Sequence, residues 1–241
     1  MTTNTKKRGF TLVELAIVIV IIGLIIGAVI KGQEMLNSAR LTSVENQVNG
    51  YKSAITTFHD RYGALPGDLA QAQSRLPGCQ DAGVNCLNGN GDGTLGDDQA
   101  ANTSVPNNEG RMAWQHLVLA NLITGVAPGA DANGNIFGEN FPSARTGGGF
   151  VLLQTHVGTP SLSGLWLRLQ GTAPDTAIDT TGTGGALTPG QAAEIDRKLD
   201  DGNALTGYVR GGGLADDCAP ATGLYNETVA SKECTLYFFV Q

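Results

Sequence analysis

Proline is absent from the first 65 residues of this chain, and the first of its nine prolines is Pro66. Charge is scarce as well: charged residues make up 15% of the sequence, and 15 Lys and Arg against 22 Asp and Glu give a net charge of -7. A chain of this charge repels a phosphate backbone unless its basic residues gather in one place. The one such cluster is Lys6, Lys7 and Arg8. We therefore expect no nucleic acid among its partners.

Local signatures of hydrolytic sites are also missing, since neither G-x-S-x-G nor H-E-x-x-H occurs in the sequence. The three histidines, His59, His116 and His156, fall in separate segments. Nothing in this pattern favours catalysis, so we expect a protein that is not an enzyme.

What the chain does have is a long apolar run close to its N-terminus. Phe10 to Ile30 is 21 residues with Glu14 as its one ionisable side chain, and as a helix it is about 31 Å long, enough to cross a bilayer. Cations precede the run and the bulk of the chain follows it, which predicts a cytoplasmic N-terminus. No small-residue cleavage site follows the run, so we expect it to be retained.

The junction KKRGFTLVE, residues 6–14, resembles the leader junction of type IV pilins and type II secretion pseudopilins. The resemblance implies that a prepilin peptidase cuts between Gly9 and Phe10 and methylates the new amine. Residues 1–9 would then be a leader peptide and residues 10–31 a transmembrane and assembly helix. The implied partners are the peptidase, other pilin or pseudopilin subunits, and an inner-membrane assembly platform with its ATPase.

The presence of Glu14 within the apolar run requires an explanation, because an unpaired carboxylate in hydrocarbon costs several kcal/mol. The new amine of Phe10 offers a partner: on a neighbouring subunit in a stack of parallel helices it can meet Glu14 and set the register. The alternative is a glutamate that reaches back to the headgroups from near the end of the helix.

The helical pattern continues beyond the apolar run. Apolar residues recur at steps of three and four as far as Tyr62, and Gly63, Pro66 and Gly67 then turn the chain. We expect one helix over about residues 11–62, whose second half, residues 32–63, lies outside the membrane. That half requires a covering domain, which residues 64–241 supply. The buried positions expected on it are Leu41, Val44, Val48, Tyr51, Ile55, Phe58 and Tyr62.

The remaining sequence alternates helical and strand patterns. A helix is expected over about 109–122, strands over 148–157 and 162–170, a helix with Thr188 as N-cap that stops at Gly202, and strands over 206–210 and 235–240. This is an α+β fold, pilin-like: a long N-terminal helix packed on a C-terminal antiparallel sheet domain.

The loop NGNGDGTLGDDQ, residues 88–99, resembles the first half of a calcium-binding loop, with oxygen-bearing side chains at alternate positions and a glycine for the turn. Gln99 stands where a bidentate glutamate is usual, so a carboxylate nearby would have to complete the shell. Calcium is the one cofactor that we expect, and the alternative is an ordinary turn. The candidate ligands are Asn88, Asn90, Asp92, Thr94, Asp97 and Asp98.

The four cysteines, Cys79, Cys86, Cys218 and Cys234, form two pairs that are close in sequence, which suggests two short disulfide loops in an oxidising compartment. Three disulfide connectivities are possible, and the alternative is that all four cysteines are free thiols. Many type IV pilins carry a disulfide placed like Cys218 to Cys234.

Taken with the resemblance, these features predict a structural subunit of a type IV pilus or a type II secretion pseudopilus. It would wait in the inner membrane as a single-pass protein with a periplasmic C-terminal domain, be cleaved, and polymerise through its N-terminal helix. The alternative is a membrane-tethered periplasmic binding protein or adhesin with a pilin-like anchor.

Overall fold

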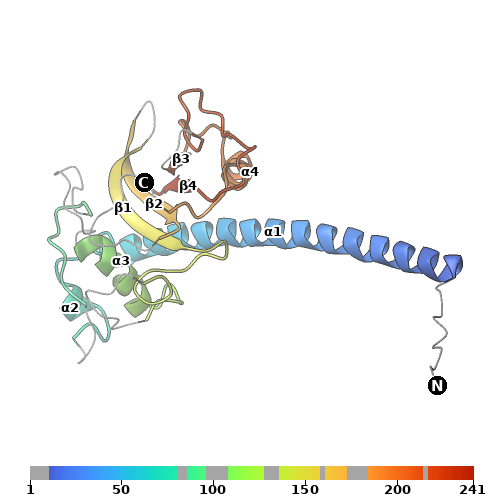
Figure 1. The fold of residues 1–241 in the computed structure, drawn as a ribbon. Coiled ribbons are helices and arrows are strands. Elements are labelled where there is room, and N and C mark those ends of the chain that lie inside the picture. Colours follow the sequence, from blue (N-terminus) through green and yellow to red (C-terminus); the bar gives the residue numbers. More distant parts are fainter. Residues whose placement is uncertain are drawn as a thin grey trace, which may run out of the picture. The chain divides into compact units, whose positions relative to one another are not determined.

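A computed structural model describes residues 11–80, 86–95, 108–127, 136–157, 161–172, 184–213 and 217–241. Contacts divide the chain into two units, Met1–Arg40 and Leu41–Gln241. The first contains the apolar part of the long helix, and the second contains the rest of that helix together with the globular part (Figure 1).

Helix α1 runs without interruption over Leu12–Tyr62, so the prediction of one long helix is confirmed. It ends where Gly63 takes a φ of +72° and its N–H donates to the carbonyl of His59 at 2.8 Å. Glycine adopts this left-handed conformation without steric cost, which makes it the usual residue after a helix. The absence of proline from this stretch of sequence is what allows 51 residues of continuous helix.

The second part of α1 forms one side of the hydrophobic core. All seven positions predicted to be buried are buried, and Ala54 joins them. At the centre, the ring of Tyr51 meets two other aromatic rings edge to face, each with its centroid 5.2 Å away: Trp114 and Phe150. One tyrosine on α1 therefore contacts both a helix and a strand of the globular part.

The strands β1 (Gly149–Val157), β2 (Leu162–Gln170), β3 (Val209–Gly213) and β4 (Cys234–Phe239) form an antiparallel sheet in the order β1-β2-β4-β3. Because side chains alternate between the two faces of a strand, Phe150 and its neighbours across the sheet share the face that contacts α1. Three strands match their predicted ranges to within a residue or so. β3 begins and ends three residues later than predicted, because residues 203–206 form a turn in which Thr206 N–H donates to the carbonyl of Asn203. The residues on the α1-facing side include Phe150, Leu152, Leu167, Leu169, Leu236 and Phe238.

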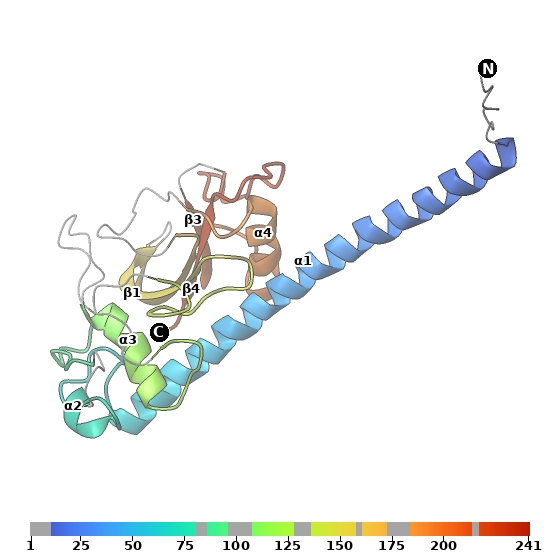
Figure 2. The ribbon, with the colours of Figure 1, turned by 60° about the horizontal axis from the view of Figure 1, so that its bottom comes forward.

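Three shorter helices complete the described fold: α2 (Ala72–Arg75), α3 (Asn108–Leu119) and α4 (Pro189–Leu199). Helix α3 lies alongside the C-terminal end of α1 (Figures 1 and 2). It ends earlier than predicted, because Asn121 adopts a φ of 57° and turns the chain. Helix α4 begins as predicted, with Thr188 and Gln191 in a reciprocal capping box. The architecture is α+β, as the sequence predicts.

Candidate functional site

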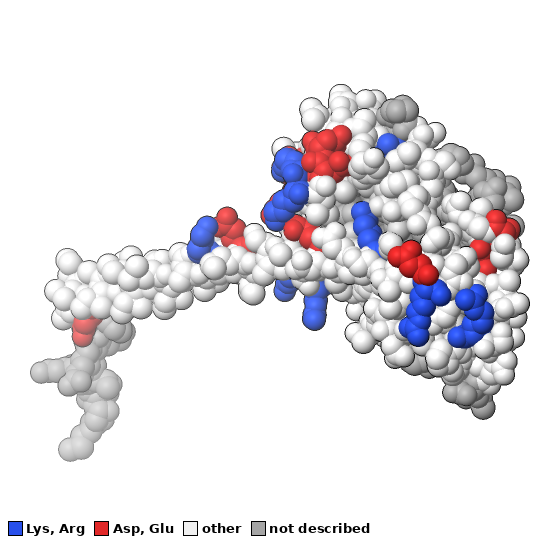
Figure 3. Space-filling model, turned by 180° about the vertical axis from the view of Figure 1, so that it is seen from behind, with Lys and Arg blue, Asp and Glu red and all other residues white. Residues whose placement is uncertain are grey.

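The apolar part of α1 has no protein partner in the described chain. Every large aliphatic side chain from Leu12 to Ile30 is between 49% and 85% exposed. This helix is long and apolar enough to cross a membrane, with a mean hydropathy of 3.1 over its most apolar 18-residue window. On the face seen in Figure 3 a long stretch of it shows neither acidic nor basic side chains. Such a surface is stable only against lipid or against other apolar helices.

Glu14 closes a hydrogen-bonded cap at the first turn of α1. Its Oε2 accepts from the backbone N–H and from the hydroxyl of Thr11, both at 2.8 Å, while Glu14 N–H donates to Thr11 Oγ1 at 3.3 Å. This T-x-x-E arrangement is a capping box. Oε1 has no hydrogen-bond partner within the described residues, so one oxygen remains for another donor. The predicted processing residues, Gly9 and Phe10, lie outside the described residues.

In the globular part, the carboxylate of Asp68 organises the glycine-rich loop. Asp68 is 1% exposed. Its Oδ1 accepts from the backbone N–H groups of Gly91 at 2.7 Å and Asp92 at 3.1 Å, and its Oδ2 accepts from Gly93 at 2.9 Å. Three amides that converge on one carboxylate form an anion nest. A buried carboxylate from the turn after α1 therefore fastens this loop.

Close backbone approach explains a glycine in the same loop. A Cβ on Gly89 would overlap the backbone of Gly67 and Asp68. The N–H of Gly89 donates to Leu69 at 3.0 Å. The two segments are therefore in backbone contact, and the loop cannot carry a side chain at that point.

The side chains predicted to bind calcium are engaged with the protein itself. Asn88 Oδ1 accepts from Gln73 N–H at 2.9 Å, and Asn90 Nδ2 donates to Asp92 Oδ2 at 2.9 Å. Asp92 Oδ1 accepts from the N–H and the hydroxyl of Thr94, at 2.8 and 2.7 Å, and these bonds hold the pKa of Asp92 below its usual range. Asp97 and Asp98 lie outside the described residues, so calcium binding stays a prediction.

His116 ties three segments together beneath this loop. Its Nδ1 accepts from the N–H of Gly67 at 2.9 Å, and its Nε2 lies 3.0 Å from the carbonyl of Leu87, to which it donates as the neutral tautomer. The residue is fully buried, and burial lowers its pKa to about 4. His116 is a neutral structural link between α3, the turn after α1 and the loop.

Both predicted cysteine pairs are disulfides, Cys79 to Cys86 and Cys218 to Cys234. The first joins two cysteines that are seven positions apart, directly before the glycine-rich loop, and the second joins the segment after β3 to the start of β4. All four cysteines are buried. They staple the fold rather than offer reactive thiols.

The segment after α4 is organised by carboxylates in a similar manner. Asp196 is fully buried; its Oδ1 accepts from Gly202 N–H at 3.1 Å and its Oδ2 from the hydroxyl of Tyr225 at 2.8 Å. Burial is the main cause that raises the pKa of Asp196 to about 6. Asp200 Oδ2 accepts from the N–H groups of Tyr208 and Val209, which fixes the chain as it enters β3.

The sequence predicts a turn at Gly63, Pro66 and Gly67, but the roles of Asp68 and His116 were not predicted from it. The available signal was a carboxylate directly after a Pro-Gly turn, followed by a loop rich in glycine. Successive backbone N–H groups form an anion nest. Glycines favour such a nest because, without a side chain, their backbone can approach a carboxylate closely. Nothing local in the sequence shows that the two segments meet, because they are separated by more than twenty residues.

Comparisons with known proteins agree with the N-terminal pattern. Residues 4–30 match the family described as the prokaryotic N-terminal methylation motif. The chain is 34% identical over 70 residues to the fimbrial protein of Neisseria meningitidis serogroup B and to the type IV major pilin protein PilE of Neisseria gonorrhoeae. Each match covers 29% of this chain. The matches cover 41% and 42% of the two relatives, so this chain spans less than half of their length.

Among solved structures, the major type IV pilin PilA1 from Clostridium difficile is similar over 85% of this chain and 96% of its own, with 16% identity and a TM-score of 0.36. The likeness to known proteins rests on the N-terminal motif and on the two curated relatives, of whose length this chain spans less than half. The chain carries the prokaryotic N-terminal methylation motif over residues 4–30, and over 70 residues it is similar to two type IV pilins.

Proposed function

We propose that this protein is a structural subunit of a type IV pilus or a closely related pseudopilus. A prepilin peptidase removes residues 1–9, and the trimmed chain polymerises through the apolar part of α1. Before assembly it is held in the inner membrane with its globular part in the periplasm. An assembly platform and its ATPase then drive its transfer into the fibre.

The observation that carries the proposal is the unpartnered apolar surface of α1 together with the first-turn cap. Burying one exposed Leu, Ile or Val is worth about 2 kcal/mol, and fourteen such side chains lie between Leu12 and Ile30. Lipid satisfies this surface in the membrane, and neighbouring helices satisfy it in a fibre. Because lipid is as apolar as these side chains, close packing of parallel helices rather than the hydrophobic effect drives their association within the membrane, and a polar contact fixes their register.

Glu14 supplies that contact in the proposal. Thr11 occupies Oε2, so the free Oε1 accepts from the new amine of Phe10 on the adjacent subunit. The cap holds the carboxylate in a fixed orientation before it meets the amine, which lowers the entropic cost of the intersubunit ion pair. Methylation of the amine leaves its positive charge in place.

Mass spectrometry of the protein from a strain with active peptidase tests the processing step. The expected mature chain begins at Phe10 with a methylated amine. Recovery of an intact N-terminus at Met1, or cleavage beyond Ile30, contradicts the proposal.

Substitution of Glu14 tests the assembly step. Glu14→Ala makes the apolar run more apolar, so membrane insertion is kept while fibre formation is lost. Glu34→Ala is the matched control, because Glu34 lies on the same helix in an exposed ion pair with Lys31 and should assemble normally. Fibres are counted by electron microscopy, and the membrane fraction by immunoblot.

Thr11→Ala separates registry from simple capping. It removes the hydroxyl from the capping box, at a cost of about 1 kcal/mol, but leaves the carboxylate for a neighbour. Registry predicts reduced but detectable fibres for Thr11→Ala and none for Glu14→Ala. Equal loss in both variants would show that Glu14 acts only as a helix cap.

A further inference from the structure

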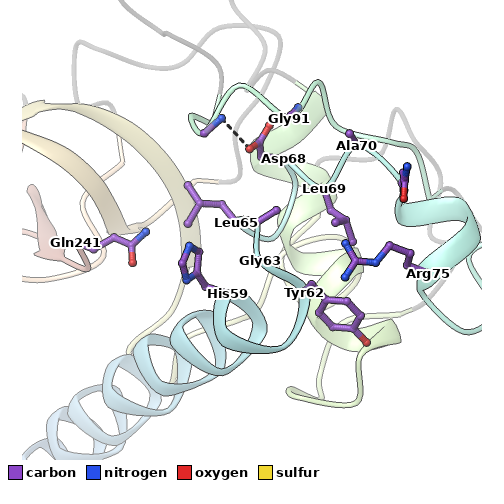
Figure 4. A pocket seen from close by; sticks show the side chains of 13 residues that line it. His59, Tyr62, Gly63, Leu65, Asp68, Leu69, Ala70, Arg75, Gly91 and Gln241 are labelled. Carbon is purple, nitrogen blue, oxygen red and sulfur yellow. Dashed lines mark hydrogen bonds between the residues drawn. The ribbon is translucent and has the colours of Figure 1, made fainter.

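A hollow on the globular unit lies at the end of α1, beside the glycine-rich loop, whose Gly91 and Gly93 line part of it. Its volume is about 370 Å³, within the range of small-molecule sites. Buried side chains of Tyr62, Leu65 and Leu69 form its floor, while exposed residues form its rim. In Figure 4, His59 and Gln241 lie on one side and Arg75 on the other, with Leu65 and Leu69 between them.

One guanidinium group, that of Arg75, lines this cavity, and that of Arg61 lies against the same tyrosine ring outside the lining. The Cζ atom of Arg75 is 5.6 Å from the centre of the Tyr62 ring, and that of Arg61 is 5.3 Å from it. Within the described residues the guanidinium group of neither arginine forms an ion pair or a hydrogen bond. Contact with the tyrosine ring orients the charges without neutralising them.

The one carboxylate side chain in the lining is already committed. Both oxygens of Asp68 accept from the amides of the loop, so Asp68 does not pair with Arg75. The cavity therefore combines an apolar floor with a rim that carries an unpaired guanidinium and the imidazole of His59.

From this arrangement we propose that the cavity binds a small organic anion that has an apolar body and one carboxylate. The apolar body would lie on Tyr62, Leu65 and Leu69, and the carboxylate would accept from Arg75. Arginine is suited to this role because its planar donors match the geometry of a carboxylate. The site is separate from the helix surface proposed for assembly, and its existence does not depend on polymerisation.

Ligand binding is tested on the full chain in detergent micelles by fluorine NMR, with empty micelles as the blank. The probes are 4-fluorobenzoate and the neutral 4-fluorobenzyl alcohol, which have similar apolar bodies. Saturable binding of the benzoate, at least tenfold tighter than that of the alcohol, is expected, since hydrogen bonds to charged groups contribute about that factor or more. Equal binding of both probes, or no saturable benzoate binding, overturns the proposal.

Variants assign the binding to this cavity. Arg75→Gln should weaken benzoate binding about tenfold, whereas Arg40→Gln, which removes an exposed arginine outside the lining, should leave it unchanged. Ala70→Glu adds a carboxylate at the exposed rim and should abolish benzoate binding while leaving the alcohol unaffected. Equal effects of Arg75→Gln and Arg40→Gln, or normal benzoate binding by Ala70→Glu, place the anion elsewhere and refute the site.

Discussion

Replacing Asp68 by asparagine tests whether one carboxylate fastens the glycine-rich loop. In the wild type, Oδ1 accepts from Gly91 and Asp92 and Oδ2 accepts from Gly93. An asparagine that keeps its oxygen toward Gly91 and Asp92 points its amide hydrogens at the N–H of Gly93, so a buried donor faces another donor. Both the lost charge and the unsatisfied amide destabilise the folded state.

The magnitude follows from the count of bonds. A hydrogen bond to a charged group contributes about 1.5 to 3 kcal/mol, so losing one bond and weakening two others costs about 2 to 4 kcal/mol. Asp68→Ala removes all three acceptor interactions and is expected to cost more, about 3 to 6 kcal/mol. For a unit of this size, about 2 to 4 °C in melting temperature corresponds to each kcal/mol. Asp68→Asn should therefore melt roughly 5 to 15 °C lower.

The assay is thermal unfolding of the full chain in detergent, followed by near-ultraviolet circular dichroism of the tryptophan and tyrosine residues. Asp60→Asn is the matched control, since Asp60 is exposed on α1 and outside the loop, and its melting temperature should stay at the wild-type value. If Asp68→Asn unfolds at the same temperature as Asp60→Asn, the carboxylate does not fasten the loop and the reasoning from the three amides is wrong.

Three other predictions concern the same unit. If calcium binds the loop of Asn88, Asn90, Asp92, Thr94 and a carboxylate from Asp97 or Asp98, a hundredfold excess over Kd adds about 2.7 kcal/mol, so the full chain melts several degrees higher in calcium than in chelator and Asp92→Ala abolishes the difference. Burial raises the pKa of Asp196 to about 6, so its folded state holds a proton more tightly than the unfolded chain and stability is lost as pH rises from about 4 to 6; urea unfolding of Asp196→Asn should lack that loss, roughly 3 kcal/mol. The disulfide between Cys218 and Cys234 spans 16 residues and is worth about 3 kcal/mol by loop entropy, so Cys218→Ala/Cys234→Ala should lower the urea midpoint, and an unchanged midpoint would show that strand pairing alone holds this segment.

The parts of the fold that sequence predicts well are those determined locally. The steps of three and four from Leu41 to Tyr62 depend only on helix geometry, and the helix stops at Gly63 because no other residue adopts its φ so easily. Thr188 and Pro189 likewise define the start of α4 through groups within one turn. In each case residues within a few positions of one another determine where the helix begins or ends.

The parts that sequence predicts poorly depend on partners far along the chain. Strand β2 reads as a half-buried strand, yet Trp166 and Arg168 on its second face are buried too, and the guanidinium of Arg168 lies 5.8 Å from the ring centre of Tyr237. Only the pairing of β2 with β4 brings these residues together. In the same way Asp68 reads as a turn residue until the loop that it binds is in place.

The same limit applies to the candidate sites. The pattern from Lys6 to Glu14 identifies the N-terminal methylation motif and the cap of α1 because both depend on residues that are adjacent in the sequence. The calcium prediction counted oxygen atoms along one loop and left out Asp68 and Glu109, whose Oε1 accepts from Asn90 N–H at 3.0 Å. Both carboxylates approach from other segments, so no local pattern could include them.

The order of strands in the sheet has a consequence for how the protein is made. Strand β4, the last of the four along the chain, lies between β2 and β3, so neither of those strands gains its shared neighbour until Cys234–Phe239 has been synthesised. Until then, Cys218 has no partner for its disulfide, because Cys234 begins that strand. A reactive thiol at Cys218 thus marks a globular unit that is still incomplete, and oxidation of this pair reports that the sheet has closed.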